Sequence, residues 1–105
     1  MSQAKKFAAI AAASSGDNTV IAAPAAGLKI RVWGLVIVAD GTVDARFEDG
    51  AAGTALTGQC ALSVSSGYTM PIGEFPWWEL TAATLLNLEL SGAVGVNGTI
   101  VYDIV

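Results

Sequence analysis

Short runs in which apolar and polar residues alternate are the feature that most constrains the fold of this chain. The alternation is clearest over residues 42–48, where Val43, Ala45 and Phe47 would share one face and the charged residues between them the other. A side-chain period of two is that of a strand with one buried face. Gly, Asn and Asp interrupt the runs at short intervals, as turns between strands require. The pattern therefore predicts a compact all-β protein.

The turn signals divide the chain into strands. We expect strands over 18–23, 28–39, 42–48, 54–57, 59–64, 68–72, 84–90 and 98–105, with an aromatic loop over 73–79 and a two-residue hairpin turn at Asp40-Gly41. This spacing predicts a two-sheet antiparallel sandwich, jelly-roll-like, with about eight strands. An immunoglobulin-like sandwich fits less well, because the chain lacks a cysteine pair with a tryptophan between. Residues 1–16 are predicted as an N-terminal arm or first strand, and residues 17–105 as a single β-sandwich domain.

The longest predicted strand, 28–39, changes character midway. Its two faces would hold Leu28, Ile30, Val32, Val36 and Val38 on one side and Lys29, Arg31, Trp33, Leu35 and Ile37 on the other. The second face turns from charged to apolar at Gly34, which predicts a bend or bulge there. The apolar end of that face would then be covered, for example by a neighbouring subunit.

The chain has no histidine, and Cys60 is its single cysteine. Ser-His-Asp and Cys-His catalysis are therefore excluded, and zinc lacks its usual ligands. Cys60 cannot form an internal disulfide, so we expect a small buried apolar residue or, alternatively, an exposed thiol. We predict no cofactor and no metal site. Calcium at loop residues Asp17, Asp40 or Asp49 is conceivable but has no spaced Asp-x-Asp motif behind it.

Two carboxylate pairs could in principle serve a glycosidase, namely Asp40 with Asp44 and Glu48 with Asp49. A structural interpretation fits better. Asp44 and Glu48 alternate with apolar residues as the solvent face of a strand, and Asp40 and Asp49 stand at turns, where aspartate bonds the local backbone. We therefore predict a protein that is not an enzyme and has no small-molecule substrate.

The low charge content points to contacts with other proteins. The chain holds 5 Lys and Arg and 9 Asp and Glu, 13% of its residues, against about 25% in an average globular protein. Such a surface favours burial against partners or sister subunits. The net charge of −4 argues against nucleic acid, whose phosphates need a basic stripe. The N-terminus imitates a secretory signal only weakly, and no apolar run approaches the roughly 18 residues of a membrane helix, so we expect no membrane partner.

Apolar, aromatic and basic residues outside the predicted core are the candidates for partner contacts: Lys5, Lys6, Phe7, Ile10, Trp33, Phe75, Trp77 and Trp78. Adjacent tryptophans in a strand point to opposite faces, so at most one of Trp77 and Trp78 can fill the core. The other would meet a neighbouring protein, stack on a glycan or cap a loop. The segment around Phe7 would lie across another subunit or form an ordinary edge strand.

Several segments, taken in order, resemble small virion proteins of tailed bacteriophages. They are Ser-Ser-Gly-Asp-Asn-Thr-Val-Ile-Ala-Ala at 14–23, Gly-Leu-Lys-Ile-Arg-Val at 27–32, Val-Asp-Ala-Arg-Phe at 43–47, Trp-Glu-Leu-Thr-Ala-Ala-Thr-Leu-Leu-Asn-Leu-Glu-Leu-Ser at 78–91 and Val-Asn-Gly-Thr-Ile-Val-Tyr at 96–102. Over residues 14–105 the pattern is similar to that of head decoration, or cement, proteins with jelly-roll-like folds. The resemblance implies a trimer or dimer on the outer surface of the capsid that bridges neighbouring capsomers. It carries over no individual binding residue.

The first hypothesis is thus a structural virion protein, a capsid decoration protein that stabilises the head. Its expected partners are the major capsid protein and copies of itself, and it would be synthesised in the host cytoplasm. The alternative is a glycan- or receptor-binding β-module of a phage tail or head fibre, which would use Trp77 or Trp78.

Overall fold

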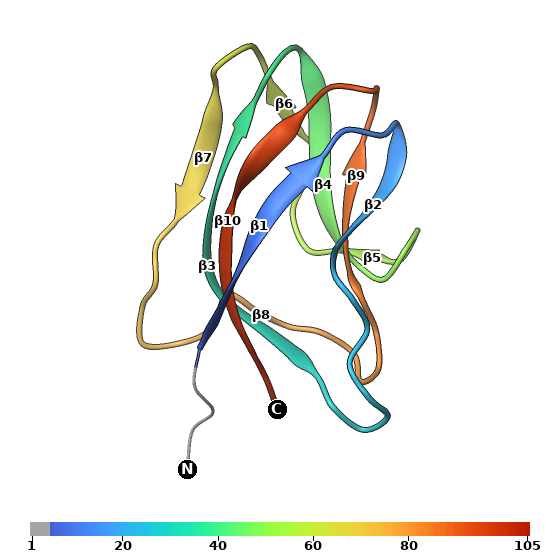
Figure 1. Ribbon diagram of the computed structural model, residues 1–105, viewed down its shortest axis with the longest axis vertical. Coiled ribbons are helices and arrows are strands. Elements are labelled where there is room, and N and C mark those ends of the chain that lie inside the picture. Colours follow the sequence, from blue (N-terminus) through green and yellow to red (C-terminus); the bar gives the residue numbers. More distant parts are fainter. Residues whose placement is uncertain (1–4) are drawn as a thin grey trace.

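The computed structural model describes residues 5–105 as an elongated all-β body (Figure 1). Its strands are β1 (Lys6–Ala12), β2 (Gly16–Ile21), β3 (Ile30–Ala39), β4 (Val43–Asp49), β5 (Thr54–Ala55), β6 (Cys60–Leu62), β7 (Gly67–Met70), β8 (Trp78–Glu79), β9 (Leu86–Leu90) and β10 (Val96–Ile104). Over residues 5–105 there is no helix long and apolar enough to cross a membrane. The all-β prediction is confirmed.

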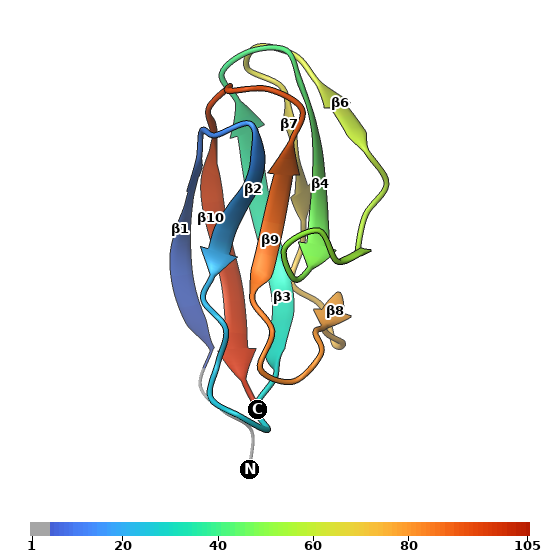
Figure 2. The ribbon, with the colours of Figure 1, turned by 90° about the vertical axis from the view of Figure 1, so that its right-hand side faces the viewer.

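The strands form two five-stranded antiparallel sheets packed face to face (Figures 1 and 2). Sheet A has the order β1-β10-β3-β7, with β8 also paired to β3, and sheet B has the order β2-β9-β4-β5, with β6 also paired to β4. Strands β5 and β6 can be counted as one interrupted strand, and so can β7 and β8, which leaves eight strands. When these eight are renumbered from 1 to 8 along the chain, the sheets have the orders 1-8-3-6 and 2-7-4-5. These are the orders of a jelly roll, so the predicted sandwich is confirmed.

The N-terminal segment is the first strand of sheet A. Strand β1 pairs with β10 without interruption, from Lys6 opposite Tyr102 to Ala12 opposite Val96. Ile10 points into the sandwich and is only 2% exposed. Of the two predicted alternatives, the described part of this segment is therefore an edge strand, and residues 1–4 lie outside the described residues.

Strand β3 contains the bulge predicted at Gly34. Its register with β10 shifts where Gly34 pairs with Val101 and Val32 pairs with Tyr102, so Trp33 is the extra residue. An extra residue inverts the inward and outward alternation of everything that follows it. The predicted faces are therefore wrong beyond the bulge. Leu35 and Ile37 belong to the core, whereas Val36 and Val38 point outward.

The predicted hairpin at Asp40-Gly41 is also wrong. The turn joins β3 of sheet A to β4 of sheet B, and these two strands do not pair with each other. Neither turn residue has the positive φ that a type I′ hairpin turn requires. The strong turn signal thus marks a crossing between the sheets, which a local dipeptide cannot distinguish from a hairpin.

The core lies between the two sheets. Phe47 of β4 is fully buried and belongs to the same cluster as leucines of β9 and isoleucines of β3 and β10. The ring of Trp78 packs against Phe47 from the side, with the ring centroids 5.4 Å apart. Burial of a side chain of this size stabilises the fold by about 1.5–3 kcal/mol.

Candidate interaction surfaces

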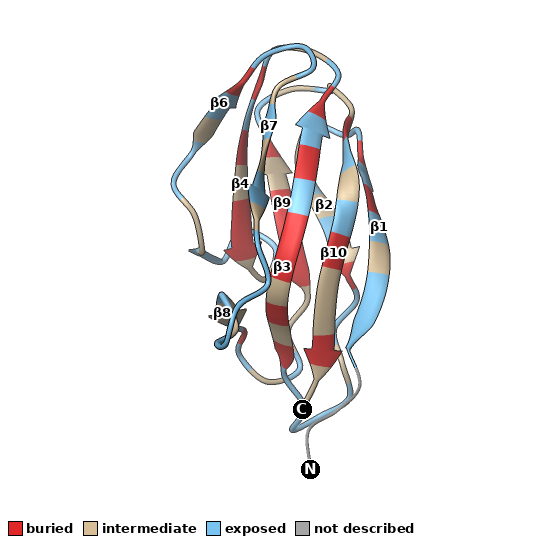
Figure 3. Cartoon of the chain, turned by 90° about the vertical axis from the view of Figure 1, so that its left-hand side faces the viewer, coloured by how far each residue is buried: buried red, intermediate tan, exposed pale blue. Residues whose placement is uncertain are grey.

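The outer face of sheet A carries no charged side chain over most of its length. Directly opposite residues of antiparallel strands share a face, and three successive rows of the register define it: Phe7, Val101 and Gly34; Ala9, Thr99, Val36 and Thr69; Ala11, Asn97, Val38 and Gly67. We call these residues the uncharged face. Figure 3 shows exposed bands along β1, β10 and β3; within the uncharged face Val101 is half-buried and Gly34 is buried.

Several large apolar side chains of this face are open to water. Phe7 is 76% exposed, Val36 38% and Val38 44%. Beside them lies a shallow hollow of about 240 Å³, lined by Gly34, Val36, Met70, Ile72, Thr99 and Val101 among others. Several exposed apolar side chains on one face without charges are typical of protein contact sites.

A compact ionic cluster lies at one end of the same face of sheet A. Asp103 is 1% exposed and accepts hydrogen bonds from the Arg31 guanidinium at 2.7 and 3.0 Å and from the Trp33 indole N–H at 3.1 Å. The hydrogen bonds from Arg31 lower the pKa of Asp103 against the opposing effect of burial, and the bond from Trp33 lowers it further. The Lys5 ammonium lies 4.3 Å from the centroid of the Trp33 ring. These charges are satisfied within the chain.

The outer face of sheet B is charged by contrast. Arg46 donates to Glu48 at 2.6 and 2.9 Å and lies 3.5 Å from Glu89, while the Asn87 amide donates to both Glu48 and Asp17. Burial alone would raise the pKa of Glu48, but the hydrogen bonds from Arg46 and Asn87 outweigh it, so the pKa lies below its usual value. The two outer faces of the sandwich thus differ sharply in polarity.

The same acidic cluster is the place where the described residues could hold a cation. Carboxylate oxygens of Asp17, Glu48 and Glu89 lie within 4.8 Å of one another. Both oxygens of Glu48, however, already accept hydrogen bonds from Arg46 and Asn87. The Arg46 guanidinium supplies the positive charge that a cation would otherwise bring, so the cluster is an ion-pair network. Of the calcium candidates, Asp17 belongs to this cluster, whereas Asp40 and Asp49 do not.

Two of the other predicted carboxylates, those of Asp49 and Asp40, also have structural partners. Asp49 accepts hydrogen bonds from the backbone N–H and hydroxyl of Thr81, and Asp40 accepts one from Asn97. Asp44 is exposed at the solvent side of β4. None of these carboxylates lines the hollow of about 240 Å³ on sheet A or the hollow of about 350 Å³ beside Trp77, whereas a glycosidase needs two carboxylates across one cleft.

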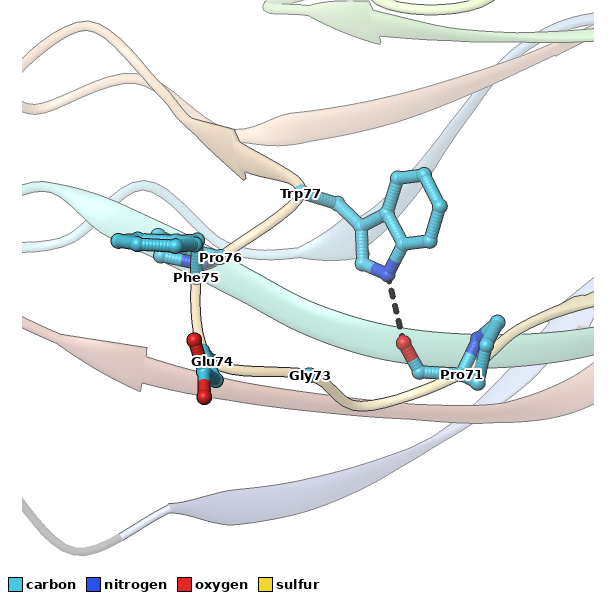
Figure 4. A pocket seen from close by; sticks show the side chains of 6 residues that line it. All are labelled: Pro71, Gly73, Glu74, Phe75, Pro76 and Trp77. Carbon is cyan, nitrogen blue, oxygen red and sulfur yellow. Dashed lines mark hydrogen bonds between the residues drawn. The ribbon is translucent and has the colours of Figure 1, made fainter.

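A second exposed surface is the loop between β7 and β8. Phe75 is 79% exposed and Trp77 48%, and with Pro71, Glu74 and Pro76 they line an open hollow of about 350 Å³ (Figure 4). The indole N–H of Trp77 donates to the Pro71 carbonyl at 2.8 Å, which fixes the ring against the loop. The backbone N–H of Trp77 donates to the Val32 carbonyl and anchors the loop on the edge of β3.

The predicted contact residues fall into three groups. Lys5, Lys6, Phe7, Phe75 and Trp77 are exposed; Trp33 is half-buried under Lys5 and bound to Asp103; Ile10 lies in the core and Trp78 packs on Phe47. The prediction that Ile10 contacts a partner is therefore wrong, because its position in β1 turns the side chain towards the core. The prediction that one of the adjacent tryptophans points inward and the other outward is confirmed.

Sequence reasoning missed the exposed valines Val36 and Val38 and their neighbour Ile72. The signal for them is Gly34, because a bulge at that position inverts the alternation of the residues that follow it.

Comparison with protein-family models gives no match for this chain, and neither does comparison with curated protein sequences. Inference about its function therefore starts from the two surfaces described above.

Proposed function

We propose that this chain is a structural virion protein of a tailed bacteriophage, a capsid decoration protein that binds the outside of the assembled head. Its partners would be the major capsid protein and further copies of itself. It would act without catalysis, by holding neighbouring capsomers together. The observation that carries the proposal is the uncharged face of sheet A, which lies opposite a face of sheet B that is covered by ion pairs.

Three features support this function. A content of charged residues of only 13% suits a protein that buries much of its surface against partners. The jelly roll is a frequent fold of virion proteins, although a fold alone does not define a function. The resemblance of residues 14–105 to head decoration proteins points in the same direction.

The uncharged face gives the proposed binding its physical basis. Phe7, Val36 and Val38 offer apolar area to a partner without the desolvation penalty of a charge. One such face is small, but a symmetric capsid presents the same site many times. Weak repeated contacts then add up through multivalency, particularly when the bound copies also touch one another.

Co-sedimentation with assembled, empty heads of a tailed bacteriophage tests this function. Val38→Lys places a charge within the uncharged face and is expected to weaken binding roughly tenfold, or about 1.4 kcal/mol per copy. Thr19→Lys is the matched control, because Thr19 is an exposed β residue on the outer face of sheet B. It should leave binding unchanged. Failure of the wild-type chain to bind any such head would refute the proposal.

The alternative is a glycan- or receptor-binding module, and the loop over 71–77 favours it. Trp77 and Phe75 present aromatic surface beside the carboxylate of Glu74, which is a combination that can stack on a sugar ring and accept its hydroxyl protons. Trp78 no longer belongs to this candidate site, since it packs on Phe47.

A glycan array separates the two functions. Binding that is lost in Trp77→Ala and kept in Val38→Lys, without any association with heads, would favour the glycan-binding module. Binding to heads that survives Trp77→Ala would favour the decoration protein.

A further inference from the structure

Strand β1 leaves an open edge of sheet A. It lies at the end of the strand order and pairs on one side only, with β10, through all seven residues from Lys6 to Ala12. Along the other side, a row of backbone N–H and C=O groups has no strand partner among the described residues (Figure 2). Such an edge is a template for pairing with another strand unless it is protected.

The other three edges of the sandwich are better protected than β1. Strands β7 and β8 are short and separated by a loop with Pro71 and Pro76, and β5 and β6 have only two and three residues. Strand β2 is interrupted by a register shift between Thr19 and Ile21. Strand β1 has a continuous register, no proline and, after Lys6, no charge. Short edges, prolines, bulges and edge lysines are the usual protections, and of these β1 has only the lysine at its first residue.

We propose that two copies of this chain join through antiparallel pairing of their β1 strands. The register in which all seven residues are paired places the two-fold axis at Ala9. Ala9 then meets Ala9 of the second copy, and Phe7 meets Ala11. A large side chain thus lies opposite a small one on the outer face, which gives each copy the same complementary contact.

Charge favours the same register. The two copies of Lys6 would lie six residues apart along the paired strands, which is about 20 Å. This separation exceeds the Debye length of about 8 Å at physiological salt, so the two ammonium groups barely repel each other. No other charged residue lies within β1.

The pairing also has a geometric consequence. A two-fold axis between antiparallel strands stands perpendicular to the sheet, so the uncharged faces of both copies point to the same side. The two sheets A become one continuous sheet with a single uncharged surface of twice the width. The inference rests on the proposed function in this respect, since a doubled surface is what a lattice-binding dimer would use.

The dimer should be weak in free solution. A seven-residue strand is about 23 Å long and a sheet layer about 10 Å thick, so the pairing covers roughly 230 Å² in projection, below the roughly 800 Å² per partner of a standard stable interface. Attachment of both copies to one lattice would strengthen it through effective concentration. A test must therefore trap a transient species.

Cysteine cross-linking at the predicted axis provides that test. In a Cys60→Ser background, Ala9→Cys places two thiols opposite each other at the Cα separation of paired strands, which suits a disulfide. Thr69→Cys is the matched control, because Thr69 is exposed on the same row at the opposite edge of sheet A. With oxidised glutathione, Ala9→Cys should form a species of twice the chain mass roughly tenfold faster than Thr69→Cys.

Equal cross-linking rates for Ala9→Cys and Thr69→Cys, in chains with the circular dichroism of the wild type, would overturn the inference. Head binding reports separately on the proposed function. If heads bind the chain but Ala9→Cys does not cross-link faster than Thr69→Cys, only the β1 pairing is contradicted. If Ala9→Cys cross-links but no head binds the chain, the decoration role is contradicted and the pairing stands.

Discussion

At the scale of single residues, Tyr68 stands out because its hydroxyl is buried without a hydrogen bond. The side chain lies at the edge of the core near Cys60 and Thr57. Burial raises the pKa of Tyr68 to about 12, since the charged phenolate loses its hydration there. Cys60 is itself only half-buried, between the two alternatives expected of it.

Tyr68→Phe should therefore stabilise the fold or leave it unchanged. The variant removes a hydroxyl that is desolvated without a partner, so the free energy of unfolding should rise by up to about 1 kcal/mol at pH 7. Urea denaturation measures this change. A loss of more than 1 kcal/mol would mean that the hydroxyl does have a stabilising partner.

The same variant should change the response to alkali. The pKa of Tyr68 is raised in the folded state, so its titration leaves the free energy of unfolding unchanged below the unfolded pKa near 10 and lowers it as the pH rises towards 12. The wild type should lose up to about 2 kcal/mol more than Tyr68→Phe across this interval. Absorbance near 295 nm reports the tyrosine titration directly.

Asp103 has the opposite character, because its charge is fully satisfied by Arg31 and Trp33. Asp103→Asn should lower the free energy of unfolding by about 1–3 kcal/mol at pH 7, the usual range for hydrogen bonds to a charged group. The pKa of Asp103 is depressed in the folded state, so its stabilisation is present above about pH 4 and lost as the pH falls through the folded pKa.

Urea titrations at pH 7 and pH 3 check this expectation. The difference between wild type and Asp103→Asn should shrink at the lower pH. Asp44→Asn is the control, since Asp44 is exposed on the other sheet and its side chain makes no ion pair among the described residues. A difference that stays constant with pH would show that the carboxylate charge is not what stabilises this end of the sheet.

At the scale of secondary-structure elements, Gly34 allows the chain to pass closely over β3. A Cβ atom at this position would lie 2.8 Å from the Met70 carbonyl oxygen and 2.9 Å from a side-chain carbon of Ile72. The segment after β7 thus needs a glycine beneath it, in addition to the bulge at Trp33.

Gly34→Ala should lower the free energy of unfolding by about 1–3 kcal/mol, the typical effect of overpacking. It should also displace residues 70–72, because the obstruction includes a backbone atom that cannot rotate away. Gly73→Ala is the control, since a Cβ atom there meets no atom within 4 Å. Chemical denaturation of both variants checks this, and equal stabilities would contradict the close approach.

The elements also show what the sequence could and could not predict. Alternation over 42–48 predicted the inward side chains of β4 correctly, because a strand between regular neighbours keeps its period. Alternation failed after Gly34 because one extra residue in β3 inverts every later side chain. The Asp40-Gly41 turn failed because sheet pairing is a long-range property that a dipeptide does not encode.

For the whole molecule, the important property is the difference between its two outer faces. The aromatic loop over 73–79 could be predicted from the order of its residues, but which tryptophan is exposed could not, and neither could the uncharged face. That face gathers residues of four strands far apart in the sequence, and only the register of sheet A brings them together.

The contrast between the faces predicts how binding to heads depends on salt. Contacts made by the uncharged face should change less than about twofold between 0.05 and 0.5 M NaCl, because salt screens charges and does not weaken apolar burial. Co-sedimentation at the two concentrations measures this. Binding that falls steeply with salt would instead implicate the charged face of sheet B.

The most direct test is a density map of phage heads with this protein bound. The proposed function predicts a jelly roll on the outer surface of the capsid, with β1, β10 and β3 of sheet A turned towards the capsid protein and the Arg46 network of sheet B towards solvent. If heads mixed with the protein show no such density, or if the jelly roll contacts the capsid through sheet B, the proposed function is contradicted.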